Sequence, residues 1–487
     1  MTNTRFEPVI GLEVHAQLNT RSKMFCGCDA HYFQATPNSH VCAVCCGMPG
    51  ALPVINRRAV DMVVLTSLAL SCAVAPQSKF DRKNYPYPDL PKGYQISQYD
   101  LPIGQSGHLE YLVGVAPRRC GIVRVHLEED TGKSLHSEEN DDRSFLDYNR
   151  CGVPLMEIVG EPELRSAEEA RAYFETLRQV LMYLDVCDGN LQEGSMRADV
   201  NVSLHERGAP YGTQVEIKNL NSFRAVFRAL EHEIERQADL LRRGESVVRE
   251  TRGWSEKREV TVSQRSKEQA HDYRYFPEPD LPPIVFTGAY LSAMRGRLPE
   301  LPAKKLERFR QQYGLAERVA GVLIQERVLA DFFENTVQAA SRVEPNVIAN
   351  WIIGDVLRLA KEIDSSITNM KLTPPLLGEL LGLLQSGAIN GTSAKVVLET
   401  IVRSGEAPSD VVTRLKLGRI ADPALLAPVV RQVLQENQRL VETYLSGKTN
   451  ALQAIRGKVM KATDGKADMK AVDEILAENL EVRTRQI

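Results

Sequence analysis

Apolar and polar residues alternate in several short stretches of the first half of the chain. From Ile10 to Leu18 every even position is apolar, whereas the odd positions include Glu13, His15 and Gln17. Successive side chains of a β-strand point to opposite faces, so this pattern predicts a strand with Glu13 beside His15 on its polar face. Similar patterns predict further strands at residues 123–128, 155–159, 196–202 and 215–218.

The polar positions of these strands are rich in carboxylates, imidazoles and basic groups. Besides Glu13 and His15, they carry Arg124, His126 and Glu128, then Arg197, Asp199 and Asn201, and finally Glu216 with Lys218. Glu157 differs because its neighbours on both sides are apolar, which predicts a buried carboxylate that needs a cation or strong donors.

Each polar face taken alone fits equally well the solvent-exposed side of an antiparallel sheet. Taken together, they favour a site for Mg²⁺ or Mn²⁺, because hard cations prefer carboxylate oxygens and bridge phosphates. Arg124, Arg197 and Lys218 can then stabilise the charge of a transferring phosphoryl group. The pattern therefore predicts a metal and phosphate site spread over one face of a sheet.

The second half of the chain has a different periodicity. A proline-rich stretch from Pro277 to Pro302 marks a boundary, and from about residue 303 apolar residues recur at intervals of three and four. The predicted helices span residues 316–334, 345–362, 374–385, 393–403, 424–445 and 470–480. The fold class is therefore α+β, with a mixed or antiparallel sheet first and helices after it.

Four cysteines have the spacing of a metal site. The sequence Cys26-Gly27-Cys28 is followed after a short loop by Cys42-Ala43-Val44-Cys45. Two close pairs can occupy the four corners of a zinc tetrahedron, and four thiolates leave no open position, which predicts a structural Zn²⁺ in residues 26–45. Four unrelated loop cysteines are the alternative, and the spare donors nearby are His31, His40 and Cys46.

Composition and charge narrow the class of protein. The 487 residues carry a formal net charge of −3, so RNA contact must come from local basic patches. We expect no secretory signal and no membrane-spanning helix. Nine cysteines are too few for a disulfide scaffold, which favours a reducing compartment and a cytoplasmic protein.

The sequence strongly resembles the B subunits of bacterial GatCAB aspartyl/glutamyl-tRNA amidotransferases along essentially its whole length. The motifs that carry the resemblance lie at residues 9–15, 79–85, 94–98, 126–134, 147–150, 156–159, 216–222 and 272–280. The resemblance implies a cradle domain with a kinase site and the zinc loop at 1–295, a helical domain at 296–405, and a YqeY-like tail at 406–487.

The resemblance also implies roles for particular residues. The metal-binding and phosphoryl-transfer residues would be Glu13, His15, Glu128, Glu157 and Glu216, with the first four as Mg²⁺ ligands. Alternation favours Glu128 over Glu129, which stays open. Contacts to ATP phosphates or the tRNA acceptor end would come from Lys79, Arg82, Lys83 and Lys218, although exposed surface explains such lysines as well.

The activity implied by the resemblance is ATP-dependent phosphorylation of the side-chain carboxylate of Glu or Asp on a mischarged tRNA. Ammonia from an amidase A subunit then displaces the phosphate, and a small C subunit completes the heterotrimer. The helical and tail domains would hold the tRNA. Clustered cations of the tail could contact its phosphates, or they could simply form the solvent-exposed face of a helix. These residues are Lys448, Arg456, Lys458, Lys461, Lys466 and Lys470.

Two alternatives remain at the level of sequence. An archaeal-type E subunit belongs to the same kinase class but carries an inserted domain, for which residues 220–330 leave no room. A tRNA-binding scaffold with a decayed kinase site is the second alternative, and the intact acidic and imidazole residues disfavour it.

Overall fold

The computed structural model describes residues 5–136, 144–266 and 273–484. Asp272, the first residue of one of the motifs above, lies outside these ranges. Contacts between Cα atoms divide the chain into two units, Met1–Lys304 and Lys305–Ile487.

A nine-stranded sheet forms the centre of the first unit. Neighbouring strands are antiparallel except β12 and β13, which are parallel, so the predicted mixed sheet is confirmed. In spatial order the strands are β14 (Val260–Ser266), β13 (Glu250–Ser255), β12 (Val215–Leu220), β11 (Met196–Glu206), β1 (Phe6–Gln17), β10 (Pro154–Gly160), β7 (Ala116–Glu129), β6 (Gly104–Val113) and β2 (Ala73–Val74).

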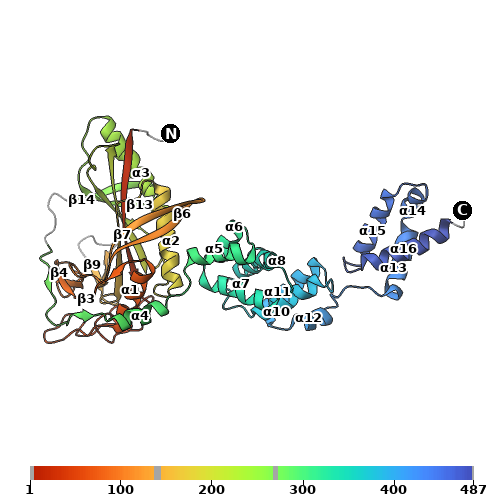
Figure 1. Ribbon diagram of the computed structural model, residues 1–487, viewed down its shortest axis with the longest axis horizontal. Helices are drawn as coiled ribbons and strands as arrows, with labels where there is room; N and C mark the ends of the chain where they lie inside the picture. Colours follow the sequence, from red (N-terminus) through yellow and green to blue (C-terminus); the bar gives the residue numbers. More distant parts are fainter. Residues whose placement is uncertain (1–4, 137–143, 267–272, 485–487) are drawn as a thin grey trace. The chain divides into compact units, whose positions relative to one another are not determined.

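The apolar face of this sheet packs against helices. Helices α1 (Arg57–Ala69), α2 (Ala167–Tyr183) and α3 (Phe223–Arg242) share one hydrophobic core with the sheet (Figure 1). Ile10, Leu12 and Val14 of β1 are almost fully buried there, which is the result that their alternation predicted. Ser166 and Ser222 begin α2 and α3 by accepting hydrogen bonds from backbone amides of the first turn.

Short strands and loops border the opposite, polar face. A three-stranded sheet contains β15 (Phe276–Pro277), β4 (Asp81–Asn84) and β5 (Tyr94–Ser97), and β5 lies next to β7. The other short elements of the unit are the pair β3 (Gln77–Ser78) and β16 (Ile284–Val285), the pair β8 (Lys133–His136) and β9 (Ser144–Asp147), and helix α4 (Gly288–Gly296), which contacts α1 on the apolar side.

The described part of the second unit is helical. Its elements are α5 (Pro302–Tyr313), which begins just before the unit boundary, α6 (Glu317–Leu323), α7 (Arg327–Ala339), α8 (Pro345–Trp351), the π-helix η1 (Ile352–Val356), α9 (Leu357–Glu362), α10 (Pro374–Gln385), α11 (Gly391–Ser404), α12 (Pro408–Arg414), α13 (Pro423–Glu436), α14 (Gln438–Leu445), α15 (Asn450–Ala462) and α16 (Met469–Thr484).

Two of the predicted helices are interrupted. The helix predicted at 316–334 is divided between α6 and α7, because Glu326 adopts an extended conformation before α7. The helix predicted at 424–445 breaks at Asn437, between α13 and α14. The apolar period continues across both breaks, and periodicity alone therefore could not locate them.

The second unit has two hydrophobic cores among its described residues. One is built from residues between Phe309 and Val411, and the other from residues between Leu426 and Leu480. The predicted boundaries between the three domains stay a prediction. In the described ranges, no helix combines the length and apolar character that a membrane crossing requires.

Candidate functional site

The strand register brings the polar side chains of three neighbouring strands into one row. His15 of β1 is paired with Glu157 of β10, and Glu157 is paired in turn with His126 of β7. On the same face of β1, two residues before His15, Glu13 is paired with Asp199 of β11. Residues directly opposite one another in an antiparallel pair have adjacent side chains, so these groups form a continuous polar surface.

His15, Glu128 and Glu157 form a compact cluster within this surface. One nitrogen or carboxylate oxygen of each lies within 4.8 Å of the others, a spacing suited to a shared metal ion. His126 lies beside them, with its Nε2 atom 3.1 Å from Glu157 and 3.6 Å from Glu128. The hydroxyl of Ser97 on β5 donates a 3.0 Å hydrogen bond to Glu128. Three of the four predicted ligands therefore converge.

The charges of this cluster are strongly coupled. Burial lowers the pKa of His126, but Glu157 and Glu128 outweigh it and raise that pKa to about 9. Burial also opposes ionisation of Glu157 and Glu128, yet His126 holds the pKa of each below its usual value. A protonated His126 thus balances two buried carboxylates, and a divalent cation would supply the same kind of balance.

Glu13 and Glu216 lie further along the same polar surface. The Asn201 amide donates a 2.8 Å hydrogen bond to Glu13, and burial together with the charge of Glu157 raises the pKa of Glu13. Glu216 accepts a 2.8 Å hydrogen bond from Thr251, and the Lys218 amine lies 3.2 Å from it. Glu13, the fourth predicted ligand, is not part of the compact cluster.

A cavity of about 460 Å³ opens over this surface. It contains both acidic and basic groups, which is the combination that a metal–nucleotide complex requires. Its described lining is Glu13, His15, Lys83, Ser97, Gln98, Tyr99, Arg124, His126, Glu157, Asp199, Asn201, Gln214, Glu216, Lys218, Arg249, Tyr273 and Tyr275.

Of the four basic residues predicted to contact phosphate, two line this cavity. Lys83 does so, and the charges of Glu128 and Glu157 raise its pKa against the effect of burial. Lys218 does so as well, although its amine is also 2.5 Å from Asp199.

The other two residues predicted to contact phosphate form ion pairs outside the cavity. Lys79 is paired with Asp81 and with Asp100. Arg82 binds Glu278 through two hydrogen bonds of 2.5 and 2.8 Å. Neither is among the described residues that line the cavity. Of their carboxylate partners, Asp100 and Glu278 lie in loops, whereas Asp81 lies in β4, two residues after Lys79.

Arg197, also predicted to stabilise a phosphoryl group, is directed toward another carboxylate. Its guanidinium lies 3.2 Å from Asp130, and Gln17 donates a 2.7 Å hydrogen bond to the same carboxylate. The charge of Arg197 outweighs burial and holds the pKa of Asp130 well below its usual range. Arg197 therefore anchors the end of β7 instead of facing the cavity.

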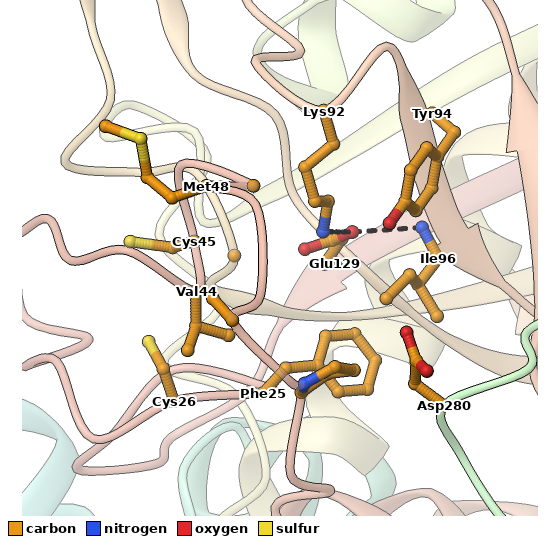
Figure 2. A pocket seen from close by; sticks show the side chains of 14 residues that line it. Phe25, Cys26, Val44, Cys45, Met48, Lys92, Tyr94, Ile96, Glu129 and Asp280 are labelled. Carbon is orange, nitrogen blue, oxygen red and sulfur yellow. Dashed lines mark hydrogen bonds and ion pairs between the residues drawn. The ribbon is translucent and has the colours of Figure 1, made fainter.

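Glu129, the alternative to Glu128, points away from the metal cluster. It forms an ion pair with Lys92 and accepts a 2.9 Å hydrogen bond from the Ile96 amide, as Figure 2 shows. This pair lines a separate cavity of about 90 Å³ next to Cys26 and Cys45. Alternation along β7 therefore assigned the two adjacent glutamates to their faces correctly.

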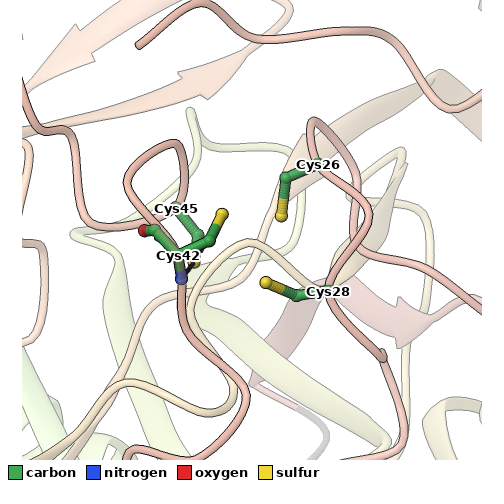
Figure 3. A group of neighbouring side chains, drawn as sticks. All are labelled: Cys26, Cys28, Cys42 and Cys45. Atoms are coloured by element: carbon green, nitrogen blue, oxygen red, sulfur yellow. Dashed lines mark hydrogen bonds between the residues drawn. The ribbon is translucent and has the colours of Figure 1, made fainter.

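The four cysteines at the zinc spacing converge from two turns (Figure 3). Their sulfur atoms all lie within 4.8 Å of one another, close to the ~3.8 Å edge of a tetrahedron with Zn–S bonds of about 2.3 Å. A hydrogen bond from Cys26 lowers the pKa of Cys45 to about 4, and the Lys23 amine lies 3.8 Å from its sulfur. The four sulfur donors and their spacing fit Zn²⁺.

Sequence reasoning grouped several further cavity residues without assigning them a role. His126, Asp199 and Asn201 share strand faces with the predicted residues, and that alternation was the available signal. Tyr273 and Tyr275 come from a loop after β14, and only their presence in a resembling motif marked them.

Comparisons with known proteins match both parts of the chain. Residues 8–292 match the GatB/GatE catalytic domain, and residues 331–480 match the GatB domain described as GatB_Yqey. The B subunit of the aspartyl/glutamyl-tRNA(Asn/Gln) amidotransferase from Thermomicrobium roseum is 51% identical, over 98% of this chain and 99% of that protein. The corresponding B subunits from Roseiflexus castenholzii and Thermodesulfovibrio yellowstonii are 49% and 47% identical, each over 97% of this chain and 98% of the relative.

Proposed function

Since this chain belongs to the family of B subunits of tRNA-dependent amidotransferases, which are glutamine-hydrolysing ligases, we propose that its first unit carries the kinase site of that reaction. The substrate is the side-chain carboxylate of Glu on tRNA(Gln), of Asp on tRNA(Asn), or of both. ATP phosphorylates it, and ammonia from the partner amidase subunit then replaces the phosphate. A heterotrimer with the A and C subunits, working in the cytoplasm, completes the enzyme.

One observation carries this proposal. Three separate strands place His15, Glu128 and Glu157 within 4.8 Å of one another, and the first and last of these line a cavity that also contains Lys83 and Lys218. Phosphoryl transfer needs little covalent help from the protein, because positioning and charge neutralisation dominate its barrier. A cluster of acids facing a cluster of cations supplies both requirements.

The position of each residue suggests its role in the proposed reaction. His15, Glu128 and Glu157 would hold Mg²⁺, with Glu13 and Glu216 orienting it toward the nucleotide. The ion, when bound, neutralises charge on the phosphate oxygens. Lys83 and Lys218 bind the phosphoryl oxygens, while Lys79 and Arg82 fix the loops around the cavity through their carboxylate partners.

The second step requires less from this chain. An acyl phosphate already has a good leaving group, so ammonia needs a dry path to it more than it needs another catalyst. The glutaminase that makes the ammonia belongs to the partner subunit in this proposal. The second unit, with its helical domain to about residue 405 and its tail domain beyond, would hold the body of the tRNA.

The direct test is ATP turnover by the assembled complex. We expect phosphate release and amide formation only when the A and C subunits, Mg²⁺ and a mischarged tRNA are all present. Assays with Asp-tRNA(Asn) and Glu-tRNA(Gln) in parallel identify the substrate. A reconstituted complex that binds both tRNAs without hydrolysing ATP would instead establish a scaffold whose kinase site has decayed.

We expect Mg²⁺ binding to release a proton. His126 holds a proton with a pKa of about 9 because two carboxylates surround it, and a cation at those carboxylates removes the attraction. Near pH 7.5 the apparent binding enthalpy should therefore change with the ionisation enthalpy of the buffer. Titration calorimetry in phosphate and Tris measures this, and His126→Gln should abolish the difference. Equal enthalpies in both buffers with the unmodified complex would contradict the assignment.

We also expect about one Zn²⁺ per chain, bound by the four thiolates. Elemental analysis of the purified complex measures the content. Cys28→Ser should lose most of the metal, whereas Cys72→Ser, a buried cysteine of the same unit outside the group, should retain it. A metal-free complex of normal stability would remove the site from the proposal.

A further inference from the structure

Five tyrosines form a continuous series of ring contacts beside the cavity. Consecutive ring centroids are 5.9, 5.9, 6.1 and 4.2 Å apart, and the last pair is stacked with an angle of 10° between its planes. In order, the members of this tyrosine series are Tyr87, Tyr85, Tyr273, Tyr275 and Tyr99.

The tyrosine series connects the cavity with the surface. Tyr273, Tyr275 and Tyr99 belong to the cavity lining, whereas Tyr85 and Tyr87 lie beyond it. Tyr99 is 57% exposed and Tyr87 is 52% exposed, which is unusual for large aromatic side chains. The two ends of the series are therefore open to solvent or ligand.

The backbone around two of these rings is fixed in an uncommon conformation. Arg274, between Tyr273 and Tyr275, has a φ angle of 45°, a left-handed conformation that is uncommon for a residue with a long side chain. Asn84 holds the segment there, because its backbone amide donates to the Tyr273 carbonyl at 2.9 Å and its side chain donates to the Arg274 carbonyl at 2.8 Å. Such a conformation persists only where the surroundings enforce it.

Cations accompany the rings. The Lys83 amine lies 5.0 Å from the centre of the Tyr273 ring and 5.9 Å from that of Tyr85. Arg249 lines the same cavity, and Arg274 is exposed on the loop. The carboxylates of the cavity, among them Glu13 and Glu157, belong to the proposed metal site. Aromatic rings interleaved with cations are the arrangement by which proteins bind unpaired nucleotides.

We propose that the tyrosine series binds the unpaired 3′ end of the aminoacylated tRNA, by stacking its bases and guiding the attached amino acid into the cavity. This proposal rests on the proposed function, because it assumes that the amino acid reacts at the cluster of His15, Glu128 and Glu157. A series of five rings that begins outside the cavity is longer than one adenine needs, which favours a strand of nucleotides over the base of ATP.

Steady-state kinetics of the assembled complex test the proposal. Tyr99→Ala and Tyr275→Leu should raise the KM for aminoacyl-tRNA about ten- to a hundredfold, since each removes a stacking surface. The KM for ATP and the glutaminase activity of the partner should stay within about twofold. Tyr99→Phe and Tyr275→Phe keep the ring and should behave as the unmodified protein. Tyr211→Ala, at an exposed tyrosine elsewhere in this unit, is the matched control.

A competition experiment identifies the part of the tRNA that is bound. Uncharged tRNA should displace labelled tRNA from the complex better than the same tRNA without its unpaired 3′ nucleotides, and the difference should disappear in Tyr99→Ala. A rise in the KM for ATP alone would assign the rings to adenine and overturn the proposal. Unchanged constants for both substrates would show that the rings serve packing only. Absence of ATP turnover in the unmodified complex would refute the proposed function instead, while the competition would still report on tRNA binding.

Discussion

Glu157→Gln is expected to reduce amide formation about a thousandfold or more while leaving the glutaminase activity of the partner largely intact. Glu157 sits at the centre of the cluster, opposite His15 on one side and His126 on the other. The amide has nearly the same shape but lacks the negative charge that would hold a divalent cation and protonated His126. Loss of one preorganised electrostatic group in a shielded site has effects of this order.

The measurement is amide formation on mischarged tRNA beside glutamine hydrolysis, both with the assembled complex. Glu13→Gln should show the same separation of the two activities. Glu110→Gln removes an exposed carboxylate from β6 of the same sheet and serves as the control for charge. If Glu157→Gln lost both activities equally, assembly and not phosphoryl transfer would depend on this residue.

Asp130→Asn is expected to lower the free energy of unfolding of the first unit by about 3–5 kcal/mol. Asp130 is buried, accepts a hydrogen bond from Gln17 and is paired with Arg197 at 3.2 Å. The substitution keeps the size of the side chain but leaves the Arg197 charge without its counter-ion. Removing one partner of a buried pair costs far more than the pair contributes, because the remaining charge stays desolvated.

Denaturant unfolding of the isolated chain measures this loss, and its pH dependence provides a second readout. The native pKa of Asp130 is depressed, so its contribution is present above about pH 4 and declines as the pH falls further. Asp130→Asn should remove that part of the acid dependence. Glu206→Gln, in the exposed pair with Arg5, should cost less than about 1 kcal/mol. Equal costs for the two variants would contradict the role of burial.

Alternation predicted the strands of the site well for a physical reason. A strand that lies between a hydrophobic core and a polar cavity needs apolar residues on one face and polar residues on the other. Because its side chains alternate between the two faces, this requirement is visible in the sequence. This is why β1, β7 and β11 were recognisable, and why Glu128 could be separated from Glu129. The same reasoning missed Asp100 and Glu278 as partners of Lys79 and Arg82, because both carboxylates lie in loops, which carry no such period.

The cysteine site was predictable from spacing because both pairs are local in sequence. The tyrosine series was not, since its members come from residues 85–99 and 273–275, and only the fold brings them together. The helix interruptions at Glu326 and Asn437 were equally hidden, because the apolar period continues across both breaks.

The sequence by itself determined the α+β class, the identity of the strands, the face of each acidic side chain and the spacing of the four thiols. All of these are local properties. Each depends on the alternation of side chains along one strand or on the spacing of residues that are close together in the sequence. Only the tertiary structure decided which strands are neighbours, and thereby that His126, Glu157 and His15 form one row. It also decided which cations remain at the cavity, because Glu278 and Asp130, distant in sequence, pair with Arg82 and Arg197.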